Sequence, residues 1–164
     1  GPDIFVKTMI KLKDKIDNLY VLLSGPSRGY VKKELSKNNI PFKHINLKNY
    51  KQTPLLYCLI DLYFIASREE GGPRSLLESF SSNIPVVSTN VGQVKDLLVN
   101  NINGYKSESF DTDELSELIL NTYNKIMNNE INQIINNANK TAYENSYLSQ
   151  KDLWKHFFEE YNEL

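Results

Sequence analysis

The sequence predicts an α/β protein with a Rossmann-like parallel sheet, flanking helices and a helical C-terminal segment. Apolar strand-like runs alternate with amphipathic helical patterns as far as about residue 110, which is typical of a parallel sheet wrapped by helices. After Asp111 only helical patterns follow. A chain of 164 residues that is 40% hydrophobic is long enough to bury a substantial core.

Each element follows from its own pattern. Strands are expected at 19–24, 42–47, 62–66, 86–88 and near Tyr105, and helices at 3–15, 30–37, 54–59, 73–82 and 94–99. Further on, one apolar helical stripe contains Leu115, Leu118, Ile119 and Tyr123, and another contains Leu153, Trp154, Phe157, Phe158 and Tyr161. We expect these helices to cap the sheet, with a break near Asn128 and Asn129 because asparagine lowers helix propensity.

Composition excludes several classes of protein. A net charge of −1 offers no basic surface for nucleic acid, and no apolar run reaches the roughly 20 residues that span a bilayer. Cys58 is the single cysteine, which excludes a disulfide within the chain and a cysteine-based zinc cluster. Because Cys58 lies between apolar neighbours ahead of a strand, we expect it to be a buried small residue.

The segment from Ser67 to Glu78 predicts an anion site. It follows an apolar strand, passes through Gly71 and Gly72, and enters an amphipathic helix at Pro73. Glycine permits positive φ and close approach of a ligand, and proline suits the first helical position. Free amides of the first helical turn and the helix dipole favour a phosphate there.

Two carboxylates flank that turn, Glu70 in the loop and Glu78 on the helix. The apolar stripe of Leu76, Leu77, Phe80 and Ile84 leaves Glu78 directed away from the core. Carboxylates accept hydrogen bonds from sugar hydroxyls. Alternatively Glu78 forms an exposed ion pair with Arg74, worth about 0.3–0.5 kcal/mol, and Glu70 is an ordinary loop residue. The residues alone leave both interpretations open.

This stretch resembles the glycosyltransferases of family 4, the group 1 glycosyl transferases. The resemblance covers about residues 3–161 and is most specific in its Glu, seven residues, Glu pattern, Glu70 to Glu78. Similar segments in the same order are Ser79-Phe80, Ile84 to Thr89, Tyr57 to Ser67, Asn90-Val91-Gly92 and Asn103-Gly104.

The resemblance implies one half of a two-domain GT-B fold. Residues 1–164 would form a single C-terminal nucleotide-sugar-binding domain, a fragment that lacks the N-terminal acceptor domain. The family's first strand, and the Arg and Lys that contact the diphosphate, would precede residue 1. Since that strand lies centrally in the order three-two-one-four-five-six, we expect five strands with a central gap, closed by repacking or by a partner.

The resemblance also assigns roles to residues. Glu70 would hold hydroxyls of the transferred sugar and Glu78 the ribose hydroxyls, as the catalytic pair. The donor-binding residues would be Gly71, Gly72, Pro73, Arg74 and Ser75. Apart from the resemblance, the strand–turn–helix pattern at Gly25 to Gly29 either places Gly25 or Arg28 beside a nucleotide or is a plain turn. Leu47, at the carboxyl end of a strand, is expected near the base. The chain departs from the family pattern at Pro73, which has no amide, and at Gln93 and Asp96.

The implied activity is transfer of a sugar from a nucleotide diphosphate sugar, with retention, to a saccharide or lipid-linked acceptor. The nucleotide sugar is a substrate, and no cofactor or metal is expected. Asp111-Thr112-Asp113 resembles a metal motif of a different fold, but Asp111 followed by Glu114 is better explained as a helix capping box.

The expected partners are the donor, the acceptor and the N-terminal GT-B domain, with self-association of the fragment possible. The expected location is the cytoplasm, or the membrane periphery for the full-length protein. Two alternatives stay open, a non-catalytic interaction module and half of a GT-B epimerase or phosphorylase.

Overall fold

The computed structural model describes residues 1–161. Its strands are β1 (Val21–Ser24), β2 (Phe42–Ile45), β3 (Tyr63–Ile65), β4 (Val86–Thr89) and β5 (Tyr105–Ser107). Its helices are α1 (Pro2–Leu12), α2 (Gly29–Lys37), the short 3-10 helix η1 (Tyr50–Gln52), α3 (Thr53–Tyr57), α4 (Arg74–Ser81), α5 (Val94–Leu97), α6 (Thr112–Met127), α7 (Asn132–Glu144) and α8 (Tyr147–Tyr161).

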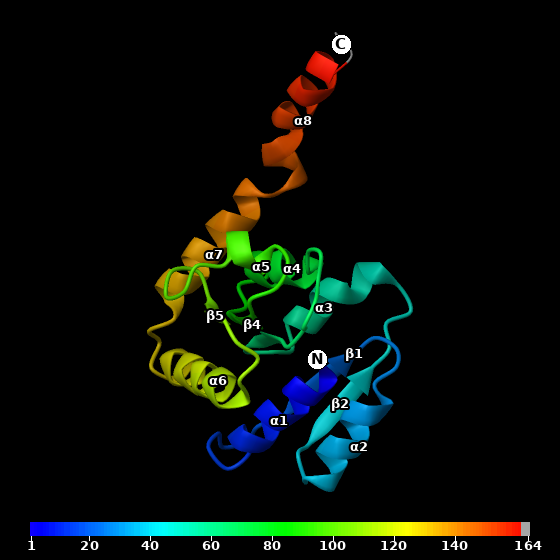
Figure 1. Cartoon of the computed structure of the whole chain (residues 1–164), viewed down its shortest axis with the longest axis vertical. Coiled ribbons are helices and arrows are strands. Elements are labelled where there is room, and N and C mark those ends of the chain that lie inside the picture. The colour runs from blue at the N-terminus through cyan, green and yellow to red at the C-terminus, as the bar shows by residue number, and fades with distance from the viewer. Residues whose placement is uncertain (162–164) are drawn as a thin grey trace.

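The five strands form two parallel sheets, as Figure 1 shows in part. One contains β1 paired with β2, from Val21 opposite Phe42 to Ser24 opposite Ile45. The other has the order β3-β4-β5. The expected fold class and strand number are therefore confirmed. No strand among the described residues pairs with both β1 and β3, so the expected gap lies between them.

The two sheets nevertheless share one apolar core. A single buried cluster contains Leu12 of α1, Leu23 of β1, Leu35 of α2, Val87 of β4 and Leu115 of α6. Helix α1 contacts α2 on one side and α6 on the other. Burial of side chains from both sheets thus connects them where backbone pairing does not.

Asparagines end three of the helices. Asn39, Asn83 and Asn129 follow α2, α4 and α6 with φ near +60°, the left-handed conformation that asparagine tolerates better than most residues. In each case the next amide reaches back into the last turn, at Ile40, Ile84 and Glu130. This geometry confirms the predicted break near Asn128 and gives it a specific mechanism.

Helix α8 contradicts one expectation. Its apolar residues do not cap the sheet, since Leu153, Trp154, Phe157, Phe158 and Tyr161 are each more than half exposed. The helix projects away from the rest of the chain beyond α7 (Figure 1). The amphipathic pattern correctly predicted the helix but not where its apolar face lies.

The expectation that Cys58 is buried is also wrong, because its side chain is exposed. It follows the last residue of α3, where Tyr57 occupies the buried position and Cys58 is turned outward.

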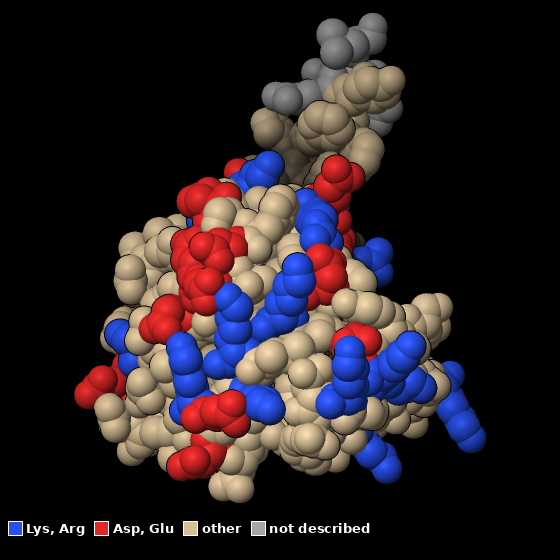
Figure 2. Space-filling view, turned by 60° about the horizontal axis from the view of Figure 1, so that its bottom comes forward, with Lys and Arg blue, Asp and Glu red and all other residues tan. Residues whose placement is uncertain are grey.

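Charges of both signs are mixed on the face shown in Figure 2, with acidic side chains interspersed among basic ones. Ion pairs connect the C-terminal end of α1 to α6: Lys11 of α1 pairs with Asp113, and Lys15, just beyond α1, pairs with Glu117. In the described part of the chain, no helix is both long and apolar enough to cross a membrane.

Candidate functional site

The segment from Ser67 to Pro73 connects β3 to α4 at the carboxyl end of the strand. The Thr89 hydroxyl at the end of β4 donates to the Ser67 carbonyl oxygen at 2.6 Å. The loop therefore lies across the ends of two neighbouring strands, where open parallel sheets bind their ligands.

The glycines of this loop behave differently from the expectation. Positive φ occurs at Gly25 and Gly92, not at Gly71 or Gly72. A Cβ added to Gly92, with φ +48°, would lie 2.5 Å from the Glu70 carbonyl oxygen and 2.7 Å from that of Gly71. A Cβ on Gly71 would meet nothing within 4 Å. The close backbone contact of this loop is therefore made by Gly92, which packs against the carbonyl groups of Glu70 and Gly71.

Helix α4 begins one residue later than expected. Pro73 is its N-cap in an extended conformation, and Arg74 is its first helical residue. Leu76 and Phe80 are fully buried, and Ser79 donates to the Ser75 carbonyl oxygen at 2.7 Å. This face anchors the helix, so its N-terminal amides and Arg74 remain at the loop.

Glu78 lies off the buried face and is half-buried. The Tyr57 hydroxyl donates to Glu78 Oε2 at 2.9 Å, and the Tyr50 hydroxyl donates to Oε1. Burial raises the pKa of Tyr57, and the hydrogen bond to Glu78 raises the pKa of Tyr50. Both phenols therefore stay protonated donors at neutral pH. The proposed Arg74–Glu78 ion pair is replaced by these two hydrogen bonds.

Glu70 is exposed on the loop and accepts fewer side-chain hydrogen bonds than Glu78. Its Oε1 accepts a hydrogen bond from the Ser67 hydroxyl at 2.9 Å. The neighbouring Arg68 points to α1, where two of its nitrogens bind the Asp3 carboxylate at 2.6 Å. That hydrogen-bonded guanidinium holds the pKa of Asp3 well below its usual range. Arg68 thus ties the loop to α1 and is not directed at Glu70.

The other predicted donor contacts have local partners. Arg28 Nε donates to the Ser24 carbonyl oxygen at 2.8 Å, and His44 Nε2 lies 2.7 Å from the Gly25 carbonyl oxygen. Leu47 follows β2, which ends two residues earlier than expected, at Ile45. In the described chain, no hydrogen bond joins Gly25 or Arg28 to the 67–78 segment. Their role at a nucleotide remains a prediction.

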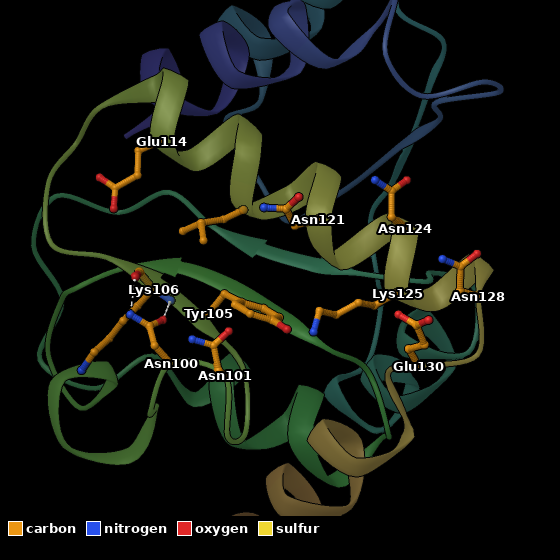
Figure 3. A pocket seen from close by; sticks show the side chains of 11 residues that line it. Asn100, Asn101, Tyr105, Lys106, Glu114, Asn121, Asn124, Lys125, Asn128 and Glu130 are labelled. Atoms are coloured by element: carbon orange, nitrogen blue, oxygen red, sulfur yellow. Dashed lines mark hydrogen bonds between the residues drawn. The ribbon is translucent and has the colours of Figure 1, made fainter.

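A small cavity of about 110 Å³ lies beside Glu78 and is lined by Tyr50, Thr53, Pro54, Tyr57, Ser81 and Ser82 as well. A wider one of about 400 Å³ lies between β5 and α6, around Tyr105, Lys125 and several asparagines (Figure 3). None of the predicted site residues lines the wider cavity. The candidate site is the segment from Glu70 to Glu78, which follows the carboxyl end of β3 and continues into α4.

Asp111 is the N-cap of helix α6. Its carboxylate accepts from the Asp113 amide at 2.8 Å. Glu114 does not complete a capping box, since it accepts instead from the hydroxyls of Ser107 and Ser109. Among the described residues, no three His, Cys, Asp or Glu side chains gather as a metal site would require.

Comparison with known proteins identifies the family. The model for glycosyl transferases group 1 matches residues 1–141, so the chain belongs to that family. Comparison with curated proteins gives no match.

Solved structures show the same fold. A glycosyltransferase from Rickettsia africae ESF-5 superposes with a TM-score of 0.82 at 22% identity, covering 97% of this chain and 44% of that one. The C-terminal domain of the group 1 family protein LpcC from Francisella tularensis gives 0.72 at 18% identity, covering 88% and 78%. Anabaena Alr3699/HepE in complex with UDP-glucose gives 0.72 at 21%, covering 87% and 40%.

These similarities assign the fold to the C-terminal half of GT-B glycosyltransferases. The chain spans less than half of the Rickettsia and Anabaena chains.

Sequence reasoning gave no role to three residues that shape the site. Gly92 and Tyr57 belonged to the segments that carried the resemblance, so a motif pointed to them without a function. Tyr50 belonged to no motif, and only the fold of η1 against α4 brings its hydroxyl to Glu78.

Proposed function

We propose that this chain is the donor-binding part of a retaining glycosyltransferase, which transfers a sugar from a nucleotide diphosphate sugar to a saccharide or lipid-linked acceptor. One observation carries the proposal: in a member of this family, Glu70 lies in the loop that crosses the ends of β3 and β4, and Glu78 lies on α4, the helix that this loop enters. Sugar and ribose hydroxyls suit carboxylate acceptors, and a diphosphate suits a helix N-terminus.

In this proposal each part of the donor has its own partner. Glu78 accepts from the ribose hydroxyls and Glu70 from hydroxyls of the transferred sugar. The exposed Arg74 and the first-turn amides of α4 face the diphosphate, where negative charge grows as the glycosidic bond breaks. Charge stabilisation of this kind is often the largest catalytic contribution.

Neighbouring structures support the choice of ligand class. Anabaena HepE was solved with UDP-glucose and with UDP and glucose. A mutant of TarM from S. aureus was solved with UDP among its ligands. Those ligands belong to those proteins, and for this chain they indicate which nucleotide sugars to test first.

A titration tests the proposal. UDP-, GDP- and ADP-sugars are added to the protein while its backbone amide resonances are followed. We expect at least one donor to shift resonances of residues 70–78, and Glu78→Ala to weaken its binding. Glu69→Gln, an exposed neighbour in the same loop, is the matched control and should bind normally. No response to any donor would overturn the proposal.

The exposed face of α8 favours a second role in protein contact. Its apolar side chains are exposed, with Trp154 and Phe158 each at 56%. Such a continuous apolar face indicates an interaction surface. We propose that it contacts a second copy of this chain. Concentration-dependent sedimentation that Phe158→Glu abolishes, together with indifference to all nucleotides, would favour an interaction module over an enzyme.

A further inference from the structure

Both carboxylate oxygens of Glu78 are already engaged by hydroxyl groups of the chain itself. Tyr57 donates to Oε2 and Tyr50 donates to Oε1. Two neighbouring hydroxyls of one ribose, each donating to one oxygen of a carboxylate, would form the same pattern of hydrogen bonds. The tyrosines thus satisfy Glu78 in the way a bound vicinal diol would.

The two tyrosines are held very differently. Tyr57 is 5% exposed, and its ring packs against Tyr63 with centroids 5.8 Å apart. Tyr50 is 67% exposed and belongs to η1, a helix of three residues. Removing the Tyr57 hydroxyl from Glu78 would disturb buried packing, whereas the exposed Tyr50 side chain can leave Glu78 without disturbing the core.

The space beside Glu78 is too small for a nucleoside as it stands. The cavity of about 110 Å³ is lined by Tyr50 itself together with Tyr57 and Glu78. Small-molecule sites usually enclose roughly 300–1,000 Å³. Moving Tyr50 away would both enlarge this space and free Glu78 Oε1.

We propose that Tyr50 is a gate that occupies the ligand-hydroxyl position on Glu78 and leaves when a nucleoside diphosphate binds, while Tyr57 is a positioning residue that stays. This inference rests on the proposed function, in which Glu78 accepts the ribose hydroxyls. Closing the gate competes with the ligand, so the apparent affinity equals the intrinsic affinity multiplied by the fraction of molecules in which Glu78 is free.

The test compares Tyr50→Phe with Tyr57→Phe. UDP, GDP and ADP, and their 2′,3′-dideoxy counterparts, are titrated calorimetrically into each protein. Tyr50→Phe should bind the ribose-containing nucleotide about three- to tenfold more tightly, because it lacks the competing hydrogen bond to a charged group. Its affinity for the dideoxy counterpart should rise by a similar factor, because that ligand also needs the space that Tyr50 fills.

Tyr57→Phe should act in the opposite direction. Without its fixed donor, Glu78 is less well oriented, and binding of the ribose-containing nucleotide should weaken about threefold or more. The dideoxy counterpart should be nearly unaffected, which a general loss of structure would not produce. Tyr30→Phe, on the exposed surface of α2, is the matched control and should leave every affinity unchanged.

The outcomes separate the two claims. If the native protein binds a nucleotide and Glu78→Gln loses it, but Tyr50→Phe binds no more tightly, the gate is wrong and the proposed function stands. If no nucleotide binds, or Glu78→Gln binds normally, the proposed function fails and the gate fails with it.

Discussion

The two carboxylates of the site are held by different kinds of structure. Glu78 is half-buried on α4, and two phenol hydroxyls fix both of its oxygens. Glu70 is exposed on a loop, with one serine hydroxyl on one oxygen and Gly92 beneath its backbone. Side-chain hydrogen bonds thus hold the carboxylate on α4, whereas backbone packing holds the loop that carries the other carboxylate.

Gly92→Ala should cause the largest loss of stability, because it disturbs the packing that holds the loop. The new Cβ would lie 2.5 Å from the Glu70 carbonyl oxygen at a positive φ. We expect the free energy of unfolding to fall by about 2 kcal/mol or more, which corresponds to roughly 4–8 °C in thermal melting.

Gly71→Ala is the control for Gly92→Ala, since its Cβ would meet nothing within 4 Å. It should change the melting temperature by less than about 2 °C. Equal losses in the two variants would mean that contact with Gly92 does not support the loop.

Tyr57→Phe should come next, because it removes one of the hydrogen bonds that fix Glu78. The buried phenol donates to a half-buried carboxylate, so we expect a loss of about 1 kcal/mol. Thermal melting should show this as roughly 2–4 °C. If Tyr30→Phe on the exposed surface lost as much, the hydrogen bond to Glu78 would not be the cause.

Acidification should weaken the link between the loop and α1. The pKa of Asp3 is depressed by Arg68, so its contribution is present above the ordinary aspartate pKa of about 3.9 and disappears as the pH falls below it. Both side chains are more than a third exposed, at 48% and 37%, so the contribution is about 0.2–1 kcal/mol.

Chemical denaturation of Asp3→Asn at several pH values checks this link. The variant should be less stable than the native protein at pH 6. The difference should shrink steadily as the pH is lowered from 4 toward 2, because Asp3 in the folded protein takes up its proton only well below the usual range. Asp14→Asn, an exposed aspartate just beyond α1, is the control. An Asp3→Asn variant as stable as the control at pH 6 would contradict the link.

Ser67→Ala should have the smallest effect of these changes. Its hydroxyl donates to an exposed carboxylate, and such contacts usually contribute under about 0.5 kcal/mol. Melting curves of Ser67→Ala and Tyr57→Phe, recorded side by side, test the comparison between the two carboxylates. A larger loss for Ser67→Ala would reverse it.

Much of the fold could be predicted because periodicity reports burial directly. Leu76 and Phe80 lie at helical spacing and are fully buried, and all five strands occur where apolar runs predicted them. The apolar face of α8 shows the limit of this reasoning. Periodicity indicates that a face is apolar, but it does not say what covers it.

The candidate site was predictable only in part. The Glu70 to Glu78 pattern indicated where the carboxylates lie, because both belong to one local segment. Their partners are long-range: Tyr50 reaches Glu78 across 28 positions and Tyr57 across 21. Gly92 supports Glu70 from the loop after β4. Contacts of this kind depend on how elements pack, which the local pattern does not encode.

A matched pair of variants tests the central claim most directly. Glu70→Gln and Glu78→Gln are compared for binding of a nucleotide diphosphate sugar and of the same nucleotide without its sugar. We predict that Glu78→Gln weakens both ligands alike, about tenfold, whereas Glu70→Gln weakens only the sugar-bearing one. If Glu70→Gln weakened both ligands, or Glu78→Gln weakened neither, the assignment of the two carboxylates to opposite ends of the donor would be wrong.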